Sequence, residues 1–425
     1  MQQIVIDGKR LERELRELAG FTHAESSPLG TAVTRVVFTQ DDLAARAWLK
    51  TLTAEAGFSW RVDPVGNTFI RWDGSDTSLP AVATGSHVDA IPHAGMYDGT
   101  VGVLGGLEAM RALKAAGFQP KRSIELVLLT SEEPTRFGIG CLGSRLIAGT
   151  LSAEKADGLP DLLPGASGTL ASVREEAGFT GALKDVKLEP GFYDSWVELH
   201  IEQGPLLERE GLPIGIVTDI AAPAGYRFVI EGVGGHAGAL LMPDRRDALC
   251  AASEVILSVE RHVLKANTDS GTVNTVGTVG TCEVHPGAVN SVPSRVTLQL
   301  DIRDTDPDRR EGVMLAVRAD IAEIAARRGV TITESTVNAD APASSSPKIV
   351  EAIEAACGEA GLAYKKMVSR AYHDTLFMAQ ICPVAMIFIP CRAGVSHRPD
   401  EYASTSAIMD GTRILASTLA TLASD

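Results

Sequence analysis

Positive charge and long apolar runs are both scarce in this sequence. Among 425 residues, 39 Lys and Arg face 54 Asp and Glu, so the net charge is −15 with histidine neutral. No basic cluster is present, which argues against a nucleic-acid partner, because phosphate backbones are bound by gathered Lys and Arg. No run approaches the ~20 apolar residues that cross a bilayer. The N-terminus also lacks the apolar stretch of a secretory signal, so we expect a cytoplasmic protein.

Cysteine is scarce as well, and none of it is paired in a Cys-x-x-Cys motif. Six Cys are scattered along the chain. A disulfide framework is not expected in a chain this long, and we expect buried thiols in apolar surroundings. Hydrophobic residues make up 45% and charged residues 22%, which is typical of a globular chain that folds in water.

Strands and helices alternate along most of the chain, which predicts an α/β layer structure. Two amphipathic helices are expected in the first 60 residues, and the stretch around 158–181, rich in Gly, Ser and Pro, is expected to be a surface excursion. The other elements expected before residue 220 are strands at 81–83, 124–129 and 196–201 and a helix at 100–116.

The pattern changes after residue 220 into a strand, helix, two strands, helix, strand order. The elements expected there are 226–231, 244–265, 273–284, 295–303, 309–328 and 330–334. This order predicts an inserted ferredoxin-like α+β domain. A Pro- and Ser-rich stretch at 341–347 marks the return to the first domain, which is completed by a helix at 348–361, a strand at 384–389 and a helix at 404–422. We therefore predict one domain from 1–220 and 336–425 and a second from 221–335.

Side chains that bind metals follow four of the predicted strands. They are His87, Glu133, His200 and His397, and Asp98 lies in the loop that begins at His87. In open α/β sheets the ligand site lies outside the carboxyl ends of the strands, so these side chains are expected to gather in one crevice.

Three imidazoles and two carboxylates suit Zn, Mn, Fe or Co. Five ligands are too many for one catalytic zinc with an open position, but they fit two metals about 3.5–4 Å apart if one carboxylate bridges. Asp98, after the tight turn 94–97, is our choice for the bridge. Asp89 is expected to accept the second ring N–H of His87 and fix its tautomer.

Each of these residues has a simpler interpretation when taken alone. Asp98 could be the N-cap of the helix that follows, His200 could be an ordinary core or surface histidine, and Glu132 with Glu133 could be a solvated pair. The joint pattern at the strand exits favours metal binding. One glutamate would then bind metal and its neighbour act as general base, and we assign Glu133 to metal and Glu132 to the base, although spacing does not order the pair.

Several motifs together resemble a known family of two-metal amidohydrolases, which includes N-carbamoyl-L-amino-acid hydrolases, β-ureidopropionase and allantoate amidohydrolase. They run from about residue 80 to the end and include 84–89, 97–99, 131–133, 198–204, 236–238 and 396–397. The resemblance implies a zinc-peptidase-like catalytic domain with a mixed central sheet and an inserted lid domain that also forms a homodimer. It further implies that Glu132 is the base, Glu133 a ligand and Asp98 the bridge.

The resemblance also implies roles for residues in contact with substrate. His236 matches a lid histidine that polarises the scissile carbonyl, usually in the partner subunit's site. Asn290 and Arg303 match groups that hold a substrate carboxylate, and Gln203 and His373 match further substrate contacts. The planar fork of Arg303 suits a carboxylate, although a strand-end arginine alone is more often in a surface ion pair. His236 alone could be a solvated turn histidine.

Two stretches depart from most of that family, at 239–243 and at 370–372 before His373. Both resemble the branch that acts on ureidoglycolate, where Tyr372 would lie near the substrate hydroxyl and favour substrates that carry it. This resemblance implies hydrolysis of the ureido C–N bond of a small anionic substrate with two divalent ions, Mn²⁺ favoured and Zn²⁺ possible. Allantoate or an N-carbamoyl-L-amino acid is the alternative substrate. An inactive binding protein on the same fold is a remote alternative, and a dipeptidase is disfavoured because His200 is commonly a carboxylate in related peptidases.

Overall fold

The computed structural model describes residues 3–425, and these form two compact units. Unit 1 holds the chain up to Thr218 together with Ser344–Met367 and His373–Asp425. Unit 2 holds Asp219–Ala343 and Val368–Tyr372. Each unit has its own buried apolar core, as expected of separate domains.

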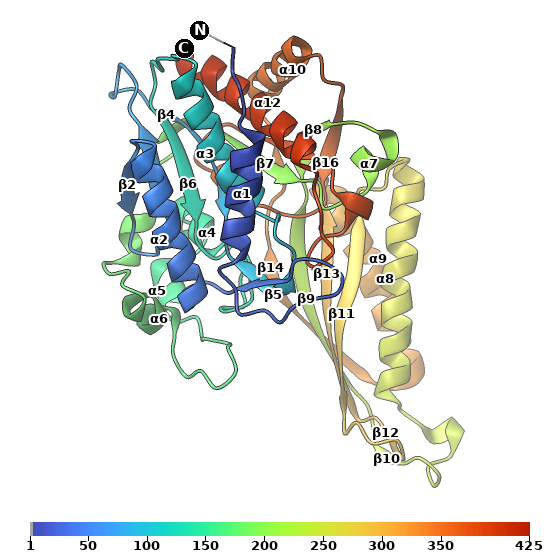
Figure 1. Ribbon diagram of the computed structural model, residues 1–425. Helices are drawn as coiled ribbons and strands as arrows, with labels where there is room; N and C mark the ends of the chain where they lie inside the picture. The colour runs from blue at the N-terminus through green and yellow to red at the C-terminus, as the bar shows by residue number, and fades with distance from the viewer. Residues whose placement is uncertain (1–2) are drawn as a thin grey trace. The chain divides into compact units, whose positions relative to one another are not determined.

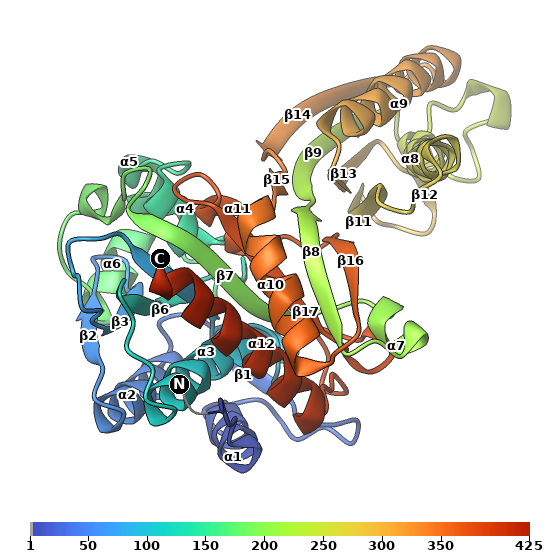
Figure 2. The ribbon, with the colours of Figure 1, turned by 90° about the horizontal axis from the view of Figure 1, so that it is seen from above.

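Unit 1 is built on a mixed sheet with the strand order β15-β8-β17-β7-β4-β6-β3-β2, and β16 pairs with β8 (Figure 2). The four central strands, β17, β7, β4 and β6, run parallel, while β8, β3 and β2 pair antiparallel with their neighbours. The mixed central sheet that the family resemblance implied is confirmed. The strands are β2 (Ser59–Val62), β3 (Thr68–Trp72), β4 (Ala81–His87), β6 (Ile124–Leu129), β7 (Tyr193–Ile201), β8 (Ile214–Ile220), β15 (Ala343–Ser344), β16 (Tyr364–Ser369) and β17 (Val384–Ile389), with β1 (Val33–Arg35) and β5 (Ala90–Ala94) paired in a small separate sheet.

Helices cover both faces of this sheet because the central strands are apolar on both sides. In β6, Leu126 and Leu128 belong to one core cluster while Val127 and Leu129 belong to the other, the alternation of a pleated strand buried on both faces. The first cluster lies under α1 (Gly8–Ala19), α2 (Gln40–Glu55), α3 (Thr100–Ala115), α10 (Pro347–Ala360) and α12 (Thr405–Ser424) (Figure 1). The second lies under α4 (Leu142–Ala148), α5 (Ala153–Asp157), α6 (Leu170–Glu176) and α11 (Thr375–Met378), and α7 (Leu206–Glu210) follows β7.

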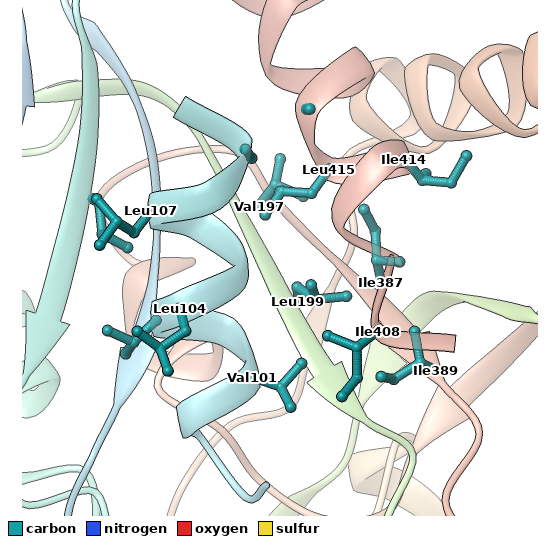
Figure 3. Packing of buried hydrophobic residues seen from close by; sticks show 14 of the residues in the cluster. Val101, Leu104, Leu107, Val197, Leu199, Ile387, Ile389, Ile408, Ile414 and Leu415 are labelled. Atoms are coloured by element: carbon teal, nitrogen blue, oxygen red, sulfur yellow. The ribbon is translucent and has the colours of Figure 1, made fainter. Parts of the chain in front are cut away.

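Helices α3 and α12 pack together against β7 and β17 (Figure 3). Leu104 of α3, Leu199 of β7 and Leu415 of α12 are fully buried members of this cluster. Each such side chain contributes about 1.5–3 kcal/mol when it leaves water. A Cβ on Gly102 would lie 2.5 Å from the carbonyl oxygen of Leu199, so α3 approaches β7 closely only because this position is glycine.

Unit 2 has an antiparallel sheet in the order β11-β13-β9-β14. Helices α8 and α9 bury their apolar sides against it, around Phe228, Val255 and Val317. The predicted strand, helix, two strands, helix, strand order is confirmed. The elements are β9 (Ala222–Glu231), α8 (Ala248–Ser270), β11 (Val276–His285), β13 (Arg295–Asp304), α9 (Pro307–Arg328) and β14 (Thr331–Ala339), with β10 (Gly235–His236) and β12 (Ser291–Val292) forming a small antiparallel pair.

The limits of unit 2 differ from the predicted 221–335. Strand β14 continues past residue 335, and its Ala339 still pairs with Ala224 of β9. The short segment 368–372 also belongs to unit 2, because the carbonyl of Ser369 accepts from the N–H of Ala221 and Arg370 Nε donates to the carbonyl of Val273. Both extensions depend on pairing between distant segments, which composition does not reveal.

Most of the stretch at 158–181 is exposed or half-buried, as expected of a surface excursion, but the stretch is not without regular structure. It contains helix α6, which begins with a capping box formed by Thr169 and Ser172. Leu170 and Val173 of this helix are buried in the second core cluster of unit 1. Gly and Pro flank the helix, and their abundance concealed a short amphipathic segment.

All six cysteines are free thiols, but they do not share one environment. Four are buried as expected, whereas Cys250 and Cys282 of unit 2 are exposed, which corrects the prediction for these two. Within residues 3–425, none of the helices combines the length and apolar character that a membrane span needs.

Candidate metal centre and active site

The carboxyl ends of the central parallel strands meet at one edge of the unit 1 sheet. Strand β4 ends at His87, and His200 lies one residue before the end of β7. Glu133 follows β6, and His397 lies in the loop after β17. Parallel strands end on the same side, so four segments that are far apart in the sequence deliver their polar side chains to one place.

Three groups of potential metal-binding side chains form there: Glu198, His200 and His373 make up one, and the other two share Asp98. The first of these two donor groups is His87, Asp98 and His200, and the second is Asp98, Glu133 and His397; within each group the potential ligand atoms lie within 4.8 Å of one another. Asp98 Oδ1 lies 3.1 Å from His200 Nε2, and Asp98 Oδ2 lies 3.1 Å from His397 Nε2. The two oxygens of one carboxylate therefore face different groups, as a bridging ligand requires.

Backbone carbonyls fix the orientation of two of the imidazole rings. His87 Nδ1 lies 3.0 Å from the carbonyl oxygen of Asp89, and His200 Nδ1 lies 2.9 Å from that of Ile201. A proton on each Nδ1 donates to its carbonyl, so each Nε2 is the nitrogen left to bind a metal, once any proton it shares with Asp98 is released.

The prediction that the Asp89 side chain holds His87 is therefore corrected. Its Oδ1 lies 3.8 Å from His87 Nδ1, too far for a hydrogen bond. The Asp89 carboxylate instead accepts from the backbone N–H groups of Glu132 at 3.3 Å and Glu133 at 3.0 Å. Asp89 thus orients the glutamate pair, and its backbone orients the histidine.

Asp98 is not the N-cap of helix α3. The N-cap is Gly99, which has a φ of 67° and makes no side-chain cap bond. A Cβ on Gly99 would lie 2.4 Å from His87 Nε2, so this turn requires glycine both for its backbone and for its space. The Asp98 carboxylate is directed at the imidazoles, which removes the simpler interpretation of this residue.

The charged groups of the site shift one another's pKa values strongly. Hydrogen bonds to Asp98 and Glu133 raise the pKa of His397 to about 11. Burial lowers the pKa of His200, but the adjacent Asp98 carboxylate outweighs that effect and raises it to about 9. Burial would raise the pKa of Asp98, yet its hydrogen bonds to His200 and His397 hold that pKa well below the usual range.

The donor set fits two divalent cations. Burial, followed by the neighbouring charges of Glu133 and Asp374, raises the pKa of Glu132 well above its usual range. Burial, followed by the charge of Glu198, raises the pKa of Asp374 to about 7. These crowded, buried carboxylates concentrate negative charge, which two cations would neutralise. Imidazole nitrogens with carboxylate oxygens are ligands for both Mn²⁺ and Zn²⁺.

Glu132 lies beside the first donor group without belonging to either group. Its Oε2 is 3.8 Å from His87 Nε2, and its Oε1 accepts from the thiol of Cys141 at 3.5 Å. Ser131 and Cys141 have left-handed φ values of 57° and 55°, which are uncommon for residues with side chains. The backbone is therefore held in a strained turn around Glu132.

Gln203 and His373, expected as substrate contacts, both lie against the metal-binding side chains. Gln203 Nε2 donates to Asp98 Oδ2 at 2.8 Å. The ring of His373 is buried, with its centroid 4.5 Å from that of His200 and 5.7 Å from that of Phe388. In this structure Gln203 therefore supports Asp98, and His373 packs behind a ligand.

The other four predicted site residues belong to unit 2 and form two pairs. His236 is exposed on β10, and Asn290 is held beside it because the Asn290 carbonyl accepts from the N–H of Ala237. Arg303 donates from Nε and Nη2 to Asp301 at 2.7 and 3.0 Å, and its guanidinium carbon lies 5.3 Å from the ring centroid of Tyr372.

Sequence reasoning missed the buried polar residues that support the ligands. Glu198 accepts from the hydroxyl of Ser86 at 2.8 Å, and Glu401 accepts from the hydroxyl of Ser396 at 2.8 Å. Each has a weak signal in the sequence, since Glu198 lies two residues before His200 and Glu401 lies four residues after His397. Spacing alone does not separate such residues from surface glutamates.

The comparison with family models gives a match to Peptidase family M20/M25/M40 over residues 83–421, which includes every member of both donor groups. The chain belongs to this peptidase family. It is therefore a hydrolase of amide-type bonds, and the match spans both units.

Two relatives and a solved structure place the chain more finely within Peptidase family M20/M25/M40. A ureidoglycolate hydrolase of Oryza sativa subsp. japonica is 50% identical over 98% of this chain and 85% of its own length. An N-carbamoyl-L-amino acid amidohydrolase of Geobacillus stearothermophilus is 36% identical over 99% of both chains. The crystal structure of AtUAH in complex with (S)-hydroxyglycine is 48% identical, covers 99% of this chain and 98% of its own, and has a TM-score of 0.87.

Proposed function

We propose that this chain hydrolyses the ureido C–N bond of (S)-ureidoglycolate. The observation that carries the reaction type is the pair of donor groups sharing Asp98, with the buried carboxyl group of Glu132 beside them. The substrate is supported by the greater identity to the rice ureidoglycolate hydrolase, 50% against 36% for the N-carbamoyl-L-amino acid amidohydrolase. The hydroxyglycine bound in AtUAH is what remains of ureidoglycolate once the carbamoyl group is removed.

Two divalent ions, with Mn²⁺ favoured over Zn²⁺, would be held by the two donor groups. When bound, they would polarise the scissile carbonyl and lower the pKa of water at the site. His87 and His200 would bind through Nε2, because the nearby carbonyls occupy Nδ1. Asp98 belongs to both groups and would help to hold both ions, and Glu133 and His397 would complete the second group.

Glu132 would act as general base and then as general acid. It takes a proton from the attacking water while the water oxygen bonds to the ureido carbon, and it returns the proton to the nitrogen as the C–N bond breaks. The raised pKa that burial gives Glu132 suits a group that must hold this proton between the two steps. Asp89 would keep the Glu132 backbone in place. The first products are hydroxyglycine and carbamate, which decompose to glyoxylate, ammonia and carbon dioxide.

The substrate would be recognised through its carboxylate and its hydroxyl group. Arg303 has a planar guanidinium, already oriented by Asp301, that can bind a carboxylate with two parallel hydrogen bonds. Asn290 would contribute to the same carboxylate, with Gln203 and His373 as further contacts. The phenol of Tyr372 would bind the α-hydroxyl, which selects strongly against analogues that lack it.

His236 would polarise the scissile carbonyl from the partner subunit of a homodimer. It is exposed on β10, and the nearby Leu241, Met242 and Val289 are also exposed. Large exposed apolar side chains close to a functional histidine suit a region that is covered during function.

The substrate is tested with metal-reconstituted protein and a panel of (S)-ureidoglycolate, allantoate and N-carbamoyl-L-amino acids. We expect release of ammonia and glyoxylate from ureidoglycolate with the highest kcat/KM. Faster turnover of either rival substrate would refute the proposed one.

Glu132→Gln tests the base with the same substrate. The amide keeps the shape of the side chain but does not accept the proton, so we expect loss of turnover at an unchanged metal content. An active variant would refute the role of Glu132. Wild-type protein that binds metal and hydrolyses none of the panel would favour an inactive binding protein.

A further inference from the structure

Glu401 is a buried carboxylate that the proposed reaction does not use. Its side chain is only 4% exposed. One oxygen accepts from the backbone N–H groups of Tyr97 at 2.8 Å and Asp98 at 3.1 Å, and the other accepts from the Ser396 hydroxyl at 2.8 Å. Ser396 directly precedes His397, so one carboxyl group joins the loop of the shared ligand to the loop of another ligand.

These contacts are costly to lose because the groups involved are buried. A buried N–H without an acceptor is strongly unfavourable, so the 97–98 backbone would move if Glu401 gave up its two hydrogen bonds. His87 and His200 are held separately, each by a backbone carbonyl close to it in sequence. The orientation of Asp98 and of the His397 loop therefore depends on Glu401. The orientation of the two buried histidines depends on it less.

We propose that Glu401 is a positioning residue that holds Asp98 and His397 at the spacing that metal binding requires. The proposal rests on the two donor groups of the proposed function. Gln203 adds a second link between the same loops, since its Nε2 lies 2.8 Å from Asp98 Oδ2 and 3.3 Å from Ser396 Oγ. The positioning acts through hydrogen bonds, not through the charge of Glu401.

The hydrogen bonds around Ser396 identify the substitutions that test this. The Ser396 hydroxyl has one proton but lies 2.9 Å from Asp98 Oδ2 and 2.8 Å from Glu401 Oε2. In Glu401→Gln, the amide can donate to Ser396, whose proton then goes to Asp98, while the amide oxygen still accepts from the backbone. Glu401→Met has a similar volume and offers no comparable acceptor.

The experiment titrates chelator-stripped, full-length protein with Mn²⁺ in competition with a metal-binding dye. For Glu401→Met we expect affinity for Mn²⁺ to fall by about 10-fold or more, the size typical of residues that orient metal ligands. For Glu401→Gln we expect an affinity close to that of the wild type. Glu359→Met, on the exposed side of α10, is the matched control and should bind Mn²⁺ like the wild type.

Wild-type affinity for Mn²⁺ in Glu401→Met would overturn the proposal. An equal loss of affinity in Glu401→Gln and Glu401→Met would also overturn it, because the charge of Glu401 would then be what matters. Circular dichroism and thermal melting of the metal-free proteins establish that the variants fold. If Glu401→Met does not fold, Ser396→Ala replaces it, because it breaks the Ser396 link and leaves both backbone bonds. We then expect weaker Mn²⁺ binding at an unchanged metal-free melting temperature, and unchanged binding would overturn the proposal.

This readout contains no substrate. Normal metal binding without turnover of ureidoglycolate would count against the proposed reaction alone. Weakened metal binding in Glu401→Met would support the positioning role whichever amide the enzyme hydrolyses.

Discussion

Asp63 is a buried carboxylate outside the two donor groups, and burial and hydrogen bonding shift its pKa in opposite directions. Its oxygens accept from the backbone N–H groups of Val65 and Asn67 and from the Asn67 side chain, at 2.9 to 3.0 Å. Burial nevertheless outweighs these donors and raises the pKa of Asp63 from 3.8 to about 6. Asp63 therefore binds its proton more tightly in the folded protein than in the unfolded chain.

This difference predicts how stability changes with pH. Below about pH 4 both states are protonated and the contribution of Asp63 is complete; as the pH rises through 6 it is lost, because the unfolded chain releases the proton first. Asp63→Asn does not titrate. We expect the free energy of unfolding of the wild type, relative to Asp63→Asn, to fall between pH 4 and 6 and to level off above. Urea unfolding of both metal-free proteins measures it, and a rise over that range would mean that the N–H donors prevail.

The candidate ligands could be predicted from the sequence, whereas their supporting residues could not. His87 and His200 stand at the ends of apolar strands, a position with a clear physical meaning in an α/β sheet. The contacts of Glu401 and Gln203 join segments separated by more than 100 residues, and no local pattern specifies them. The predicted contact between the Asp89 side chain and His87 was wrong for a related reason. Sequence spacing does not distinguish the side chain of a residue from its backbone carbonyl.

Helix α3 connects the hydrophobic core to the metal centre. It begins directly after Asp98 and Gly99 and packs against β4 and β7. At Gly102 a Cβ would lie 2.5 Å from the Leu199 carbonyl oxygen and 2.6 Å from Ser86 Cβ. The position of α3 on the sheet is thus fixed by the close contact at Gly102, about one helical turn after Asp98.

Gly102→Ala should therefore destabilise the protein. Forcing a methyl group into this contact costs about 1–3 kcal/mol and moves α3 away from β7. The matched control is Gly358→Ala in α10, where a Cβ meets nothing within 4 Å. That change should stabilise the protein by about 0.5–1 kcal/mol, since alanine favours helix over glycine. Urea unfolding of both variants measures the contrast, and equal effects would contradict the close packing of α3.

The elements with clear periodicity and strong burial were predictable, and the short or exposed ones were not. Strands 124–129 and 384–389 are fully buried and apolar apart from Glu125, and the structure has them at those positions. Strand β2 has only four residues and is largely exposed, and α6 is hidden among Gly and Pro. The end of unit 2 was placed too early because β14 is exposed along most of its length, so hydrophobicity gives no sign of its continuation.

At the scale of the whole molecule, the proposed residues divide between the two units. Both donor groups and Glu132 belong to unit 1, whereas His236, Asn290, Arg303 and Tyr372 belong to unit 2. If His236 acts in the partner's site, each active site draws residues from both subunits of a homodimer.

Mixing two inactive variants tests this arrangement. In a dimer of one His236→Ala chain and one Glu132→Gln chain, one site has both residues and the other has neither. Random pairing of equal amounts places half of the chains in mixed dimers, so about a quarter of wild-type activity should return. The activity of the mixture after subunit exchange measures it, and each variant alone is the control. If a mass measurement verifies that mixed dimers have formed and no activity returns, His236 acts within its own chain.

The candidate ligands differ in how far they reach into solvent. The side chains of His87 and His200 are 3% and 1% exposed, whereas that of His397 is 47% exposed. Solvent therefore reaches the two donor groups from the His397 side. An ion held by Asp98, Glu133 and His397 would exchange with the medium first, and the ion between the two buried histidines would be retained longer. The protein would then respond to metal supply in two stages, keeping one tightly held ion while the other follows the concentration around it.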